Sequence, residues 1–393
     1  MKYLFFSGIV AHIAFVLLLL WQPILLDKVT SKLTNKYYQY QKNKAYKQLT
    51  SGKNLTINQE IATVFYPWVA QKKNSESQNY IRVNSMPYND LTSAVKSLTD
   101  GDTLHVPEGV YSTPMTITKN DITIKGDGHV VFEKSAVRGK GFILSQGNDL
   151  TVENIECRHI SVRDGNGACI RLEGRNLTLK HVYFHHSQEG ILETSKDVGS
   201  IYIFDSRFEQ LGFNGQAHGL YTNKADLYIY QSLILASKSE GHSIKVRGKK
   251  LLIESSILAS LSSIDSRLID MSNGGELTVN NSILAQGPQS ANGQMIGFGL
   301  EGLVYQNNTI QLLGNIIYLD RLGQNYLLAV PNHSQLSIDV TQEQNIIVGH
   351  DLSGDNENSN TYIELRSEMN LPNYPYFPRF FCHDLKNCTL RPN

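Results

Sequence analysis

Cysteine is scarce in this chain, and neither sign of charge predominates. Only 4 of the 393 residues are cysteine, and they form no Cys-x-x-Cys pair and adjoin no histidine-rich run. A structural zinc site therefore lacks a ligand set in the sequence. Lys plus Arg and Asp plus Glu number 36 each, so no overall field attracts a nucleic acid. We expect neither structural zinc nor a nucleic-acid partner.

The cysteines by themselves leave the cellular compartment open. Cys382 and Cys388 can close a small C-terminal loop if the compartment is oxidising. For Cys157 and Cys169, an equally good interpretation is that both are inert buried thiols.

Charged residues are also sparse, at 18% of the chain, and Asn, Ser, Gly and Thr take much of their place. This composition is typical of many short strands joined by turns. The chain is long enough to bury a large core, either as one extended β-rich domain or as two domains.

One long apolar run is present, from Tyr3 to Leu26. It can cross the ~30 Å hydrocarbon core as a helix, and no small-residue cleavage signature follows it, which predicts an uncleaved membrane anchor over residues 1–26. Six lysines between Lys28 and Lys47 would by themselves keep that side cytoplasmic. We nevertheless expect the β-rich, Asn-rich remainder to face the periplasm, with a polar stalk or capping linker over residues 27–78.

A recognisable sequence opens the remainder of the chain. Asp90 can cap a helix over 91–98, and the phrases Gly-Asp-Thr-Leu (101–104) and Pro-Glu-Gly-Val-Tyr (107–111) precede a series of strands. This order resembles the start of right-handed parallel β-helix proteins of the pectin-lyase-like superfamily. Further phrases, Gly-His-Ser-Ile-Lys (241–245) and Asn-Gly-Gly (273–275), resemble uncharacterised bacterial members. The resemblance implies an all-β solenoid with a short capping helix and a polysaccharide partner.

An internal repeat points to the same architecture independently. Strand-like phrases begin at intervals of 27, 24, 26, 24, 26 and 26 residues, at Leu150, Leu177, Ile201, Leu227, Leu251, Leu277 and Leu303. This period is too short for a pair of helices and suits one β-coil per repeat. We therefore predict a parallel β-helix over 79–319, followed by an irregular C-terminal cap or tail over 320–393.

The repeat stacks ionisable side chains in two columns. Placing the copies in register gives a first column and, three residues further on, a second: His218, His242 and Arg267, then Tyr221, Lys245 and Asp270. Because direction alternates along a strand, the second column should point outward together with Arg247.

These outward groups have the chemistry for removing a proton next to a carboxylate. A cation can stabilise the enolate-like charge while a His or Tyr takes or gives the proton. We infer catalytic roles for His218, Tyr221, His242, Lys245, Arg247 and Asp270. We expect substrate binding by Glu189, Glu193, Asn223, Arg267 and Asn273.

Two other chemistries of the superfamily fit less well. Asp270, with only Asp265 nearby, makes a poor calcium cage, and no adjacent Asp pair supports hydrolysis by two carboxylates. The three histidines at 181, 185 and 186 include an i, i+4 pair, a spacing that binds metal on a helix, but the segment reads as a strand, which disfavours zinc. We expect no metal and no other cofactor.

The predicted function is therefore action on an acidic bacterial polysaccharide, as a lyase or a C5-epimerase. The sequence leaves open whether the protein is an enzyme at all. The main alternative is a glycan-binding or scaffold protein of the cell envelope that uses the same face. A third is a structural spacer, in which the ladder would be covered by the C-terminal segment and Lys245 and Asp270 would form a weak surface ion pair.

Overall fold

The computed structural model describes residues 36, 37, 40, 44, 47, 52, 55–73, 79–332, 336–353, 359–370 and 374–378. The chain divides into two units, Met1–Asn54 and Leu55–Asn393, and the description below concerns the second. The predicted membrane anchor and the pair Cys382 and Cys388 lie outside the described residues. Where the structure describes the chain, no helix combines the length and apolar character needed to cross a bilayer.

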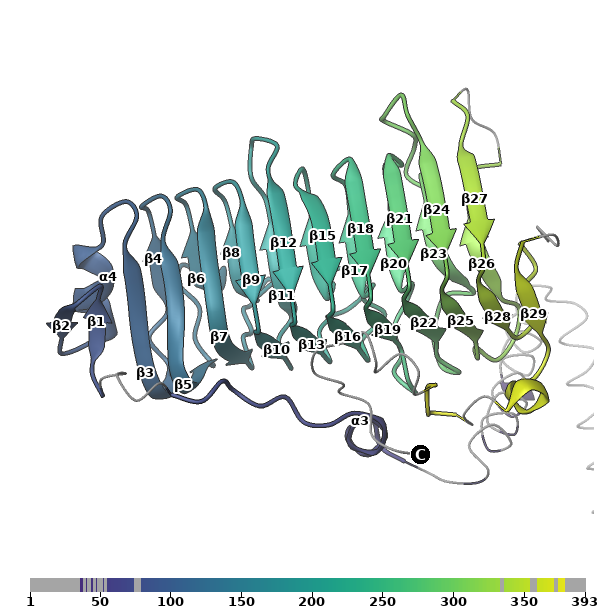
Figure 1. Cartoon of the computed structure of the whole chain (residues 1–393), viewed down its shortest axis with the longest axis horizontal. Helices are drawn as coiled ribbons and strands as arrows, with labels where there is room; N and C mark the ends of the chain where they lie inside the picture. Colours follow the sequence, from purple (N-terminus) through teal and green to yellow (C-terminus); the bar gives the residue numbers. More distant parts are fainter. Residues whose placement is uncertain are drawn as a thin grey trace, which may run out of the picture. The chain divides into compact units, whose positions relative to one another are not determined.

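Parallel strands stacked coil upon coil form the second unit, which confirms the predicted parallel β-helix (Figure 1). One ladder of strands comprises β3 (Thr103–Tyr111), β5 (Thr123–Glu133), β7 (Leu150–Arg158), β9 (Leu177–Lys180), β12 (Ser200–Phe204), β15 (Asp226–Tyr230), β18 (Lys250–Glu254), β21 (Glu276–Asn280), β24 (Thr309–Leu313) and β27 (Asp339–Glu343). A second ladder branches from β7 and comprises β10 (Tyr183–His185), β13 (Arg207–Glu209), β16 (Leu233–Leu235), β19 (Ile257–Ala259), β22 (Ile283–Gln286), β25 (Ile316–Leu319), β28 (Ile346–Val348) and β29 (Thr361–Ile363).

The third ladder is a separate sheet, called here the site sheet. It comprises β4 (Met115–Ile117), β6 (Gly141–Ser145), β8 (Ala168–Leu172), β11 (Glu189–Glu193), β14 (Leu220–Thr222), β17 (Ile244–Val246), β20 (Ile269–Met271), β23 (Gln294–Phe298) and β26 (Tyr326–Ala329). Apolar side chains from the three ladders fill the interior as one continuous core.

The register confirms the predicted repeat as far as Leu277. Leu150 pairs with Leu177, and the next four predicted starts follow it in the same column. The last predicted start is wrong, because Leu277 pairs with Ile310 and Leu303 lies in a connecting loop. The solenoid also continues to β29 at Ile363, where an irregular tail was predicted. Longer loops between the late strands break the regular spacing, so the sequence pattern fades before the coils end.

Side chains in one corner of the solenoid hold successive coils in register. The hydroxyl of Ser232 accepts a hydrogen bond from the backbone N–H of Ser206 at 3.1 Å. The backbone N–H of Ser232 in turn donates to the hydroxyl of Ser256 in the next coil, also at 3.1 Å. Asn315 and Asn345 continue this ladder with a backbone N–H bond of 2.9 Å. Buried backbone donors are thereby satisfied where the chain bends between two ladders.

Two helices cover edges and faces of the solenoid. Helix α4 (Leu91–Ser97) begins at Asp90, whose carboxylate accepts the Ser93 N–H at 2.8 Å, as predicted. Beside it, β1 (Ile81–Val83) pairs antiparallel with β2 (Met86–Tyr88) and with β3. Helix α3 (Ile57–Val64) buries Ile61 and Val64 in an apolar cluster with side chains of the second ladder, and the short 3-10 helix η1 (Arg366–Met369) follows β29. Residues 57–64 of the predicted linker thus pack on the solenoid.

The structure corrects the interpretation of two cysteines. Cys157 of β7 and Cys169 of β8 form a disulfide in the interior, so they are not inert thiols. This bond joins two ladders within one coil. Because disulfides persist in oxidising compartments, it also bears on the location of the protein.

Candidate functional site

The site sheet brings the predicted outward column together. Tyr221 of β14 pairs with Lys245 of β17, and Lys245 pairs with Asp270 of β20. Their neighbours Ile244 and Val246 point into the core, so the column lies on the outer face. The register prediction is confirmed, but Lys245 is only 9% exposed and Asp270 only 3%. The column is therefore a covered surface rather than an open ladder.

Asp270 is the centre of a network of cations and hydrogen-bond donors. Its carboxylate accepts Ser272 Oγ at 2.8 Å and lies 3.1 Å from both Arg267 Nη1 and Lys245 Nζ. Burial by itself would raise the pKa of Asp270, but His242, Lys245, Ser272 and Arg267 together hold that pKa below its ordinary value. Asp270 is consequently a carboxylate at neutral pH, and it fixes the positions of the two cations beside it.

A residue that the sequence analysis missed completes this network. Glu301, in the loop after β23, places Oε1 2.6 Å from Lys245 Nζ and Oε2 2.6 Å from Arg247 Nη2. Backbone bonds tie this loop to the end of β20, with Gly299 N donating to Met271 O at 2.9 Å. The loop has no counterpart in the repeat, so periodicity could not locate Glu301. It covers the column from the C-terminal side.

His218 and His242 are held in one tautomer by the backbone of the next coil. The N–H of His242 donates to His218 Nδ1, and the N–H of Arg267 donates to His242 Nδ1, both at 3.1 Å. In the neutral ring, the proton must then reside on Nε2. The two rings stack at 4.9 Å between centroids, and His242 Nε2 lies 3.7 Å from Asp270 Oδ2.

The environment keeps both imidazoles neutral. Burial, aided by neighbouring charges such as Lys245, lowers the pKa of His218 to about 3. Burial likewise lowers the pKa of His242 to about 4, although Asp270 opposes the shift. At neutral pH each ring is therefore a hydrogen-bond donor through Nε2 and cannot accept a proton at that atom. Of the predicted proton carriers, the half-buried Tyr221 is left as the candidate base.

Glu189 heads the first column. The pairing of Ile191 with Leu220 places Glu189, two residues earlier, opposite His218, and its side chain is buried. Burial raises the pKa of Glu189 well above its ordinary value, against the opposing effects of Arg171 and the His218 backbone. Among the described residues, its Oε2 atom has no hydrogen-bond partner. Glu189 is thus a buried acid beside the first imidazole, with its pKa raised by burial.

Among the other predicted substrate-binding residues, Glu193 serves the solenoid. Glu193 is fully buried, and its Oε2 accepts backbone N–H groups of Asn223 at 2.7 Å and Lys224 at 2.8 Å. Its carboxylate is unavailable to a substrate because it builds the turn after β14. Asn273 donates to the Arg247 carbonyl at 3.4 Å, and the guanidinium of Arg267 donates to Gln294 Oε1. Asn223 and Asn273 are partly exposed at the edge of the site.

Asp265 and the clustered histidines lie apart from this network. Asp265 is fully buried and accepts hydroxyl hydrogen bonds from Ser260 and Ser290, each at 2.5 Å. His181 pairs with Asp205 at 2.8 Å, whereas His185 lies 3.1 Å from Glu156 on the second ladder. Within the described ranges, no group of three or more His, Cys, Asp or Glu residues is arranged to hold a metal ion.

A polar cavity continues the face of the site sheet toward its N-terminal coils. It has a volume of about 500 Å³ and is lined by Gln146, Asn148, Glu173, Gly174, Arg175, Thr194, Ser195, Lys196 and Asp197. Arg171, in register with Leu192 and hence with Tyr221, donates from Nε to Thr194 Oγ1 at 3.1 Å.

No protein-family model matches the sequence, and no curated protein matches it. Several solved structures do match the chain. An alginate lyase of family PL6 in complex with a trisaccharide has a TM-score of 0.35 and 14% identity over 59% of this chain and 56% of its own. An alginate lyase in complex with a ligand designated G6 has a TM-score of 0.34 and 14% identity over 66% and 60%. A mutant PL6 alginate lyase has a TM-score of 0.37 and 17% identity over 76% and 41%. This chain thus spans 41–60% of the length of those chains.

Proposed function

We propose that the protein acts on an acidic polysaccharide by removing the proton at C5 of a uronate ring, as a lyase or a C5-epimerase. The observation that carries the proposal is the cluster on the site sheet, in which the buried Lys245 and the half-buried Arg247 lie beside two imidazoles that present Nε2–H donors. Abstraction of a proton next to a carboxylate needs positive charge and hydrogen-bond donors where negative charge develops.

The geometry supports a role for each group. Lys245 and Arg247 neutralise the substrate carboxylate, and the Nε2–H groups of the histidines donate to its oxygens as the C5–H electrons move onto them. Tyr221 Oη takes the C5 proton. In elimination, the C4–O bond then breaks, a C4=C5 double bond forms, and the phenol returns the proton to the leaving oxygen. In epimerisation, C5 takes a proton from solvent on the opposite face, and Tyr221 releases the abstracted proton to solvent.

One observation favours the alternative of a non-catalytic glycan-binding protein. The charge of Lys245 is already neutralised by ion pairs with Asp270 and Glu301, and both Lys245 and Asp270 are buried. Such a network can position a surface for binding without taking part in proton transfer.

An unbiased panel of polymers distinguishes these functions. We expect the full-length chain, purified in detergent, to produce unsaturated uronate ends from at least one acidic polymer, measured by ultraviolet absorbance. If it is an epimerase, we expect deuterium at C5 by NMR in D2O instead. Alginate, polygalacturonate and hyaluronan are the acidic members, and dextran is the neutral control. Binding without either product would select the scaffold alternative, and neither binding nor product would overturn both.

We also propose that residues 1–26 anchor the protein in the inner membrane with the β-helix in the periplasm. The disulfide between Cys157 and Cys169 supports this, because a thiol pair in the cytoplasm would be kept reduced. In a Gram-negative host, a variant with Cys382 and Cys388 replaced by Ser should resist maleimide labelling after denaturation until a reductant is added. Labelling of both remaining cysteines without reduction would contradict the periplasmic location.

A further inference from the structure

The Glu301 side chain makes the same contacts that a bound uronate carboxylate would make. Its two oxygens are shared between Lys245 Nζ and Arg247 Nη2, each 2.6 Å away. Lys245 is on β17 and Arg247 directly follows this strand, and their shared partner Glu301 places both cations on the same outer side of the sheet. Two cations that hold one carboxylate in this way form a binding site for carboxylates in general.

Glu301 is the most readily displaced member of the network. Its side chain is 41% exposed, whereas that of Lys245 is 11% exposed and that of Asp270 is 3% exposed. The backbone of Glu301 is fixed by its N–H bond to Ser272 O at 3.0 Å, so the side chain can rotate into solvent without moving the loop. Lys245 would still be held by Asp270 after this rotation.

Arg247 is incompletely satisfied by Glu301. The ion pair uses Nη2, while the Nε atom is buried and has no hydrogen-bond partner in the part of the chain that the structure describes. Guanidinium groups bind carboxylates most strongly through two parallel N–H donors. A carboxylate free of the constraints of the Glu301 backbone can approach Arg247 in that bidentate manner.

We infer that Lys245 and Arg247 form a carboxylate-binding site that Glu301 occupies, and that a uronate carboxylate takes its place when the polymer binds. This inference rests on the proposed action on a uronate polymer and adds the atoms that recognise the acid group. Glu301 is then an intramolecular competitor, which lowers the apparent affinity by the fraction of molecules in which the site is free. Because of this competition, only a ligand that also makes other contacts along the site sheet can displace Glu301 readily.

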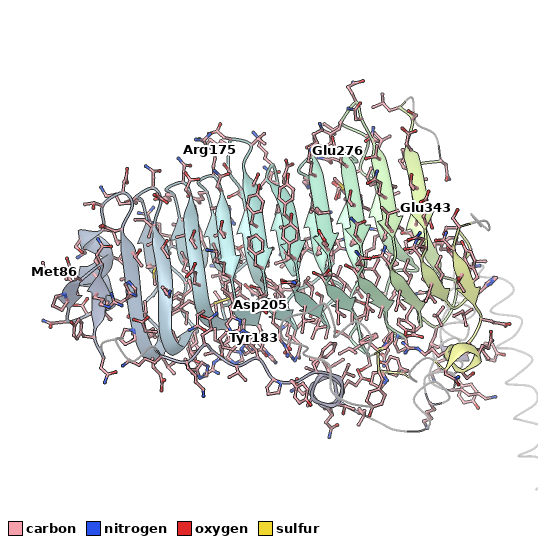
Figure 2. All side chains as sticks on the ribbon, in the orientation of Figure 1. Met86, Arg175, Tyr183, Asp205, Glu276 and Glu343 are labelled. Carbon is pink, nitrogen blue, oxygen red and sulfur yellow. A yellow bond between two sulfur atoms is a disulfide. The ribbon has the colours of Figure 1, made fainter. Side chains whose placement is uncertain are left out.

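The test compares two glutamates that each bind two cations. Glu301→Gln removes the competitor. Glu276→Gln is the matched control, because Glu276 of β21 pairs with Lys249 and Lys250, each at 3.0 Å, on another ladder (labelled in Figure 2). Calorimetric titration of the full-length chain with oligomers of guluronate, mannuronate and galacturonate should show about tenfold tighter binding of at least one of them to E301Q. E276Q should bind as the unchanged protein does.

Further variants make the outcome specific. The gain in E301Q should disappear when Arg247→Gln is added, and Glu301→Ala should reproduce the gain if E301Q folds poorly in thermal unfolding. Unchanged or weaker oligouronate binding in folded E301Q and E301A would overturn the inference. If turnover is present but its KM is the same in E301Q, the proposed function stands and this inference fails. If oligouronates bind more tightly but no variant turns them over, the carboxylate site stands and the lyase or epimerase proposal fails.

Discussion

Replacing Lys245 with Met should reduce turnover of the acidic polymer by about 100-fold or more. Loss of a single group that stabilises developing negative charge in a buried site typically costs two to three orders of magnitude in rate. Lys245 contacts two carboxylates of the network, with Nζ 3.1 Å from Asp270 and 2.6 Å from Glu301. The measurement is kcat/KM on whichever polymer of the panel is processed, for the unchanged chain and K245M.

Stability must be separated from catalysis in this variant. K245M leaves Asp270 with Arg267 and Ser272 as partners, so we expect a loss of about 3 kcal/mol at most, visible as a lower Tm. Lys249→Met is the matched control, because Lys249 pairs with Glu276 at the surface and lies outside the column. Full activity in a folded K245M variant would remove Lys245 from the mechanism.

The protein should lose stability as the pH falls from about 6.5 to 4, and His218 and His242 should account for much of the loss. In the unfolded chain a histidine has a pKa of about 6.5, whereas the folded pKa values are about 3 and about 4. Below pH 6.5 the unfolded state therefore binds protons that the folded state excludes, which lowers the free energy of unfolding. At pH 4 the effect is on the order of 3 kcal/mol for each histidine.

Urea unfolding at pH 7 and pH 4.5 measures this contribution. Asn is the appropriate replacement, because its Oδ1 can accept the backbone N–H that Nδ1 accepts, and it does not titrate. H218N and H242N should each lose less stability between the two pH values than the unchanged chain does. His350→Asn, at an exposed position, should leave the loss unaltered. Equal pH dependence in all four proteins would show that the two imidazoles are not held neutral by the fold.

The contrast between Tyr221 and Glu301 shows what a repeat can and cannot reveal. Tyr221, Lys245 and Asp270 could be placed in one column because their coils have nearly equal lengths, and pairing in a parallel ladder then follows from counting residues. Glu301 lies in a longer coil, in which Leu277 pairs with Ile310, and its loop folds back over an earlier strand. The sequence repeat contains no signal for this folding back of the loop.

The predicted roles of the histidines illustrate the same limit. Their position beside the column follows from sequence spacing, but a spacing cannot say which ring nitrogen carries the proton. That depends on the backbone N–H of the next coil, which occupies Nδ1 in both rings. The disulfide is similar, because Cys157 and Cys169 meet only when two ladders close around the interior.

For this protein, the sequence alone determined the parallel β-helix, its capping helix and the stacking of the ionisable columns, because each depends on local alternation and regular spacing. Only the tertiary structure decided how deeply Lys245 and Asp270 are buried, that Glu193 builds a turn, and that Glu301 holds the two cations. Those features depend on which non-repeating segment packs over the sheet, and packing between distant segments leaves no periodic trace in the chain.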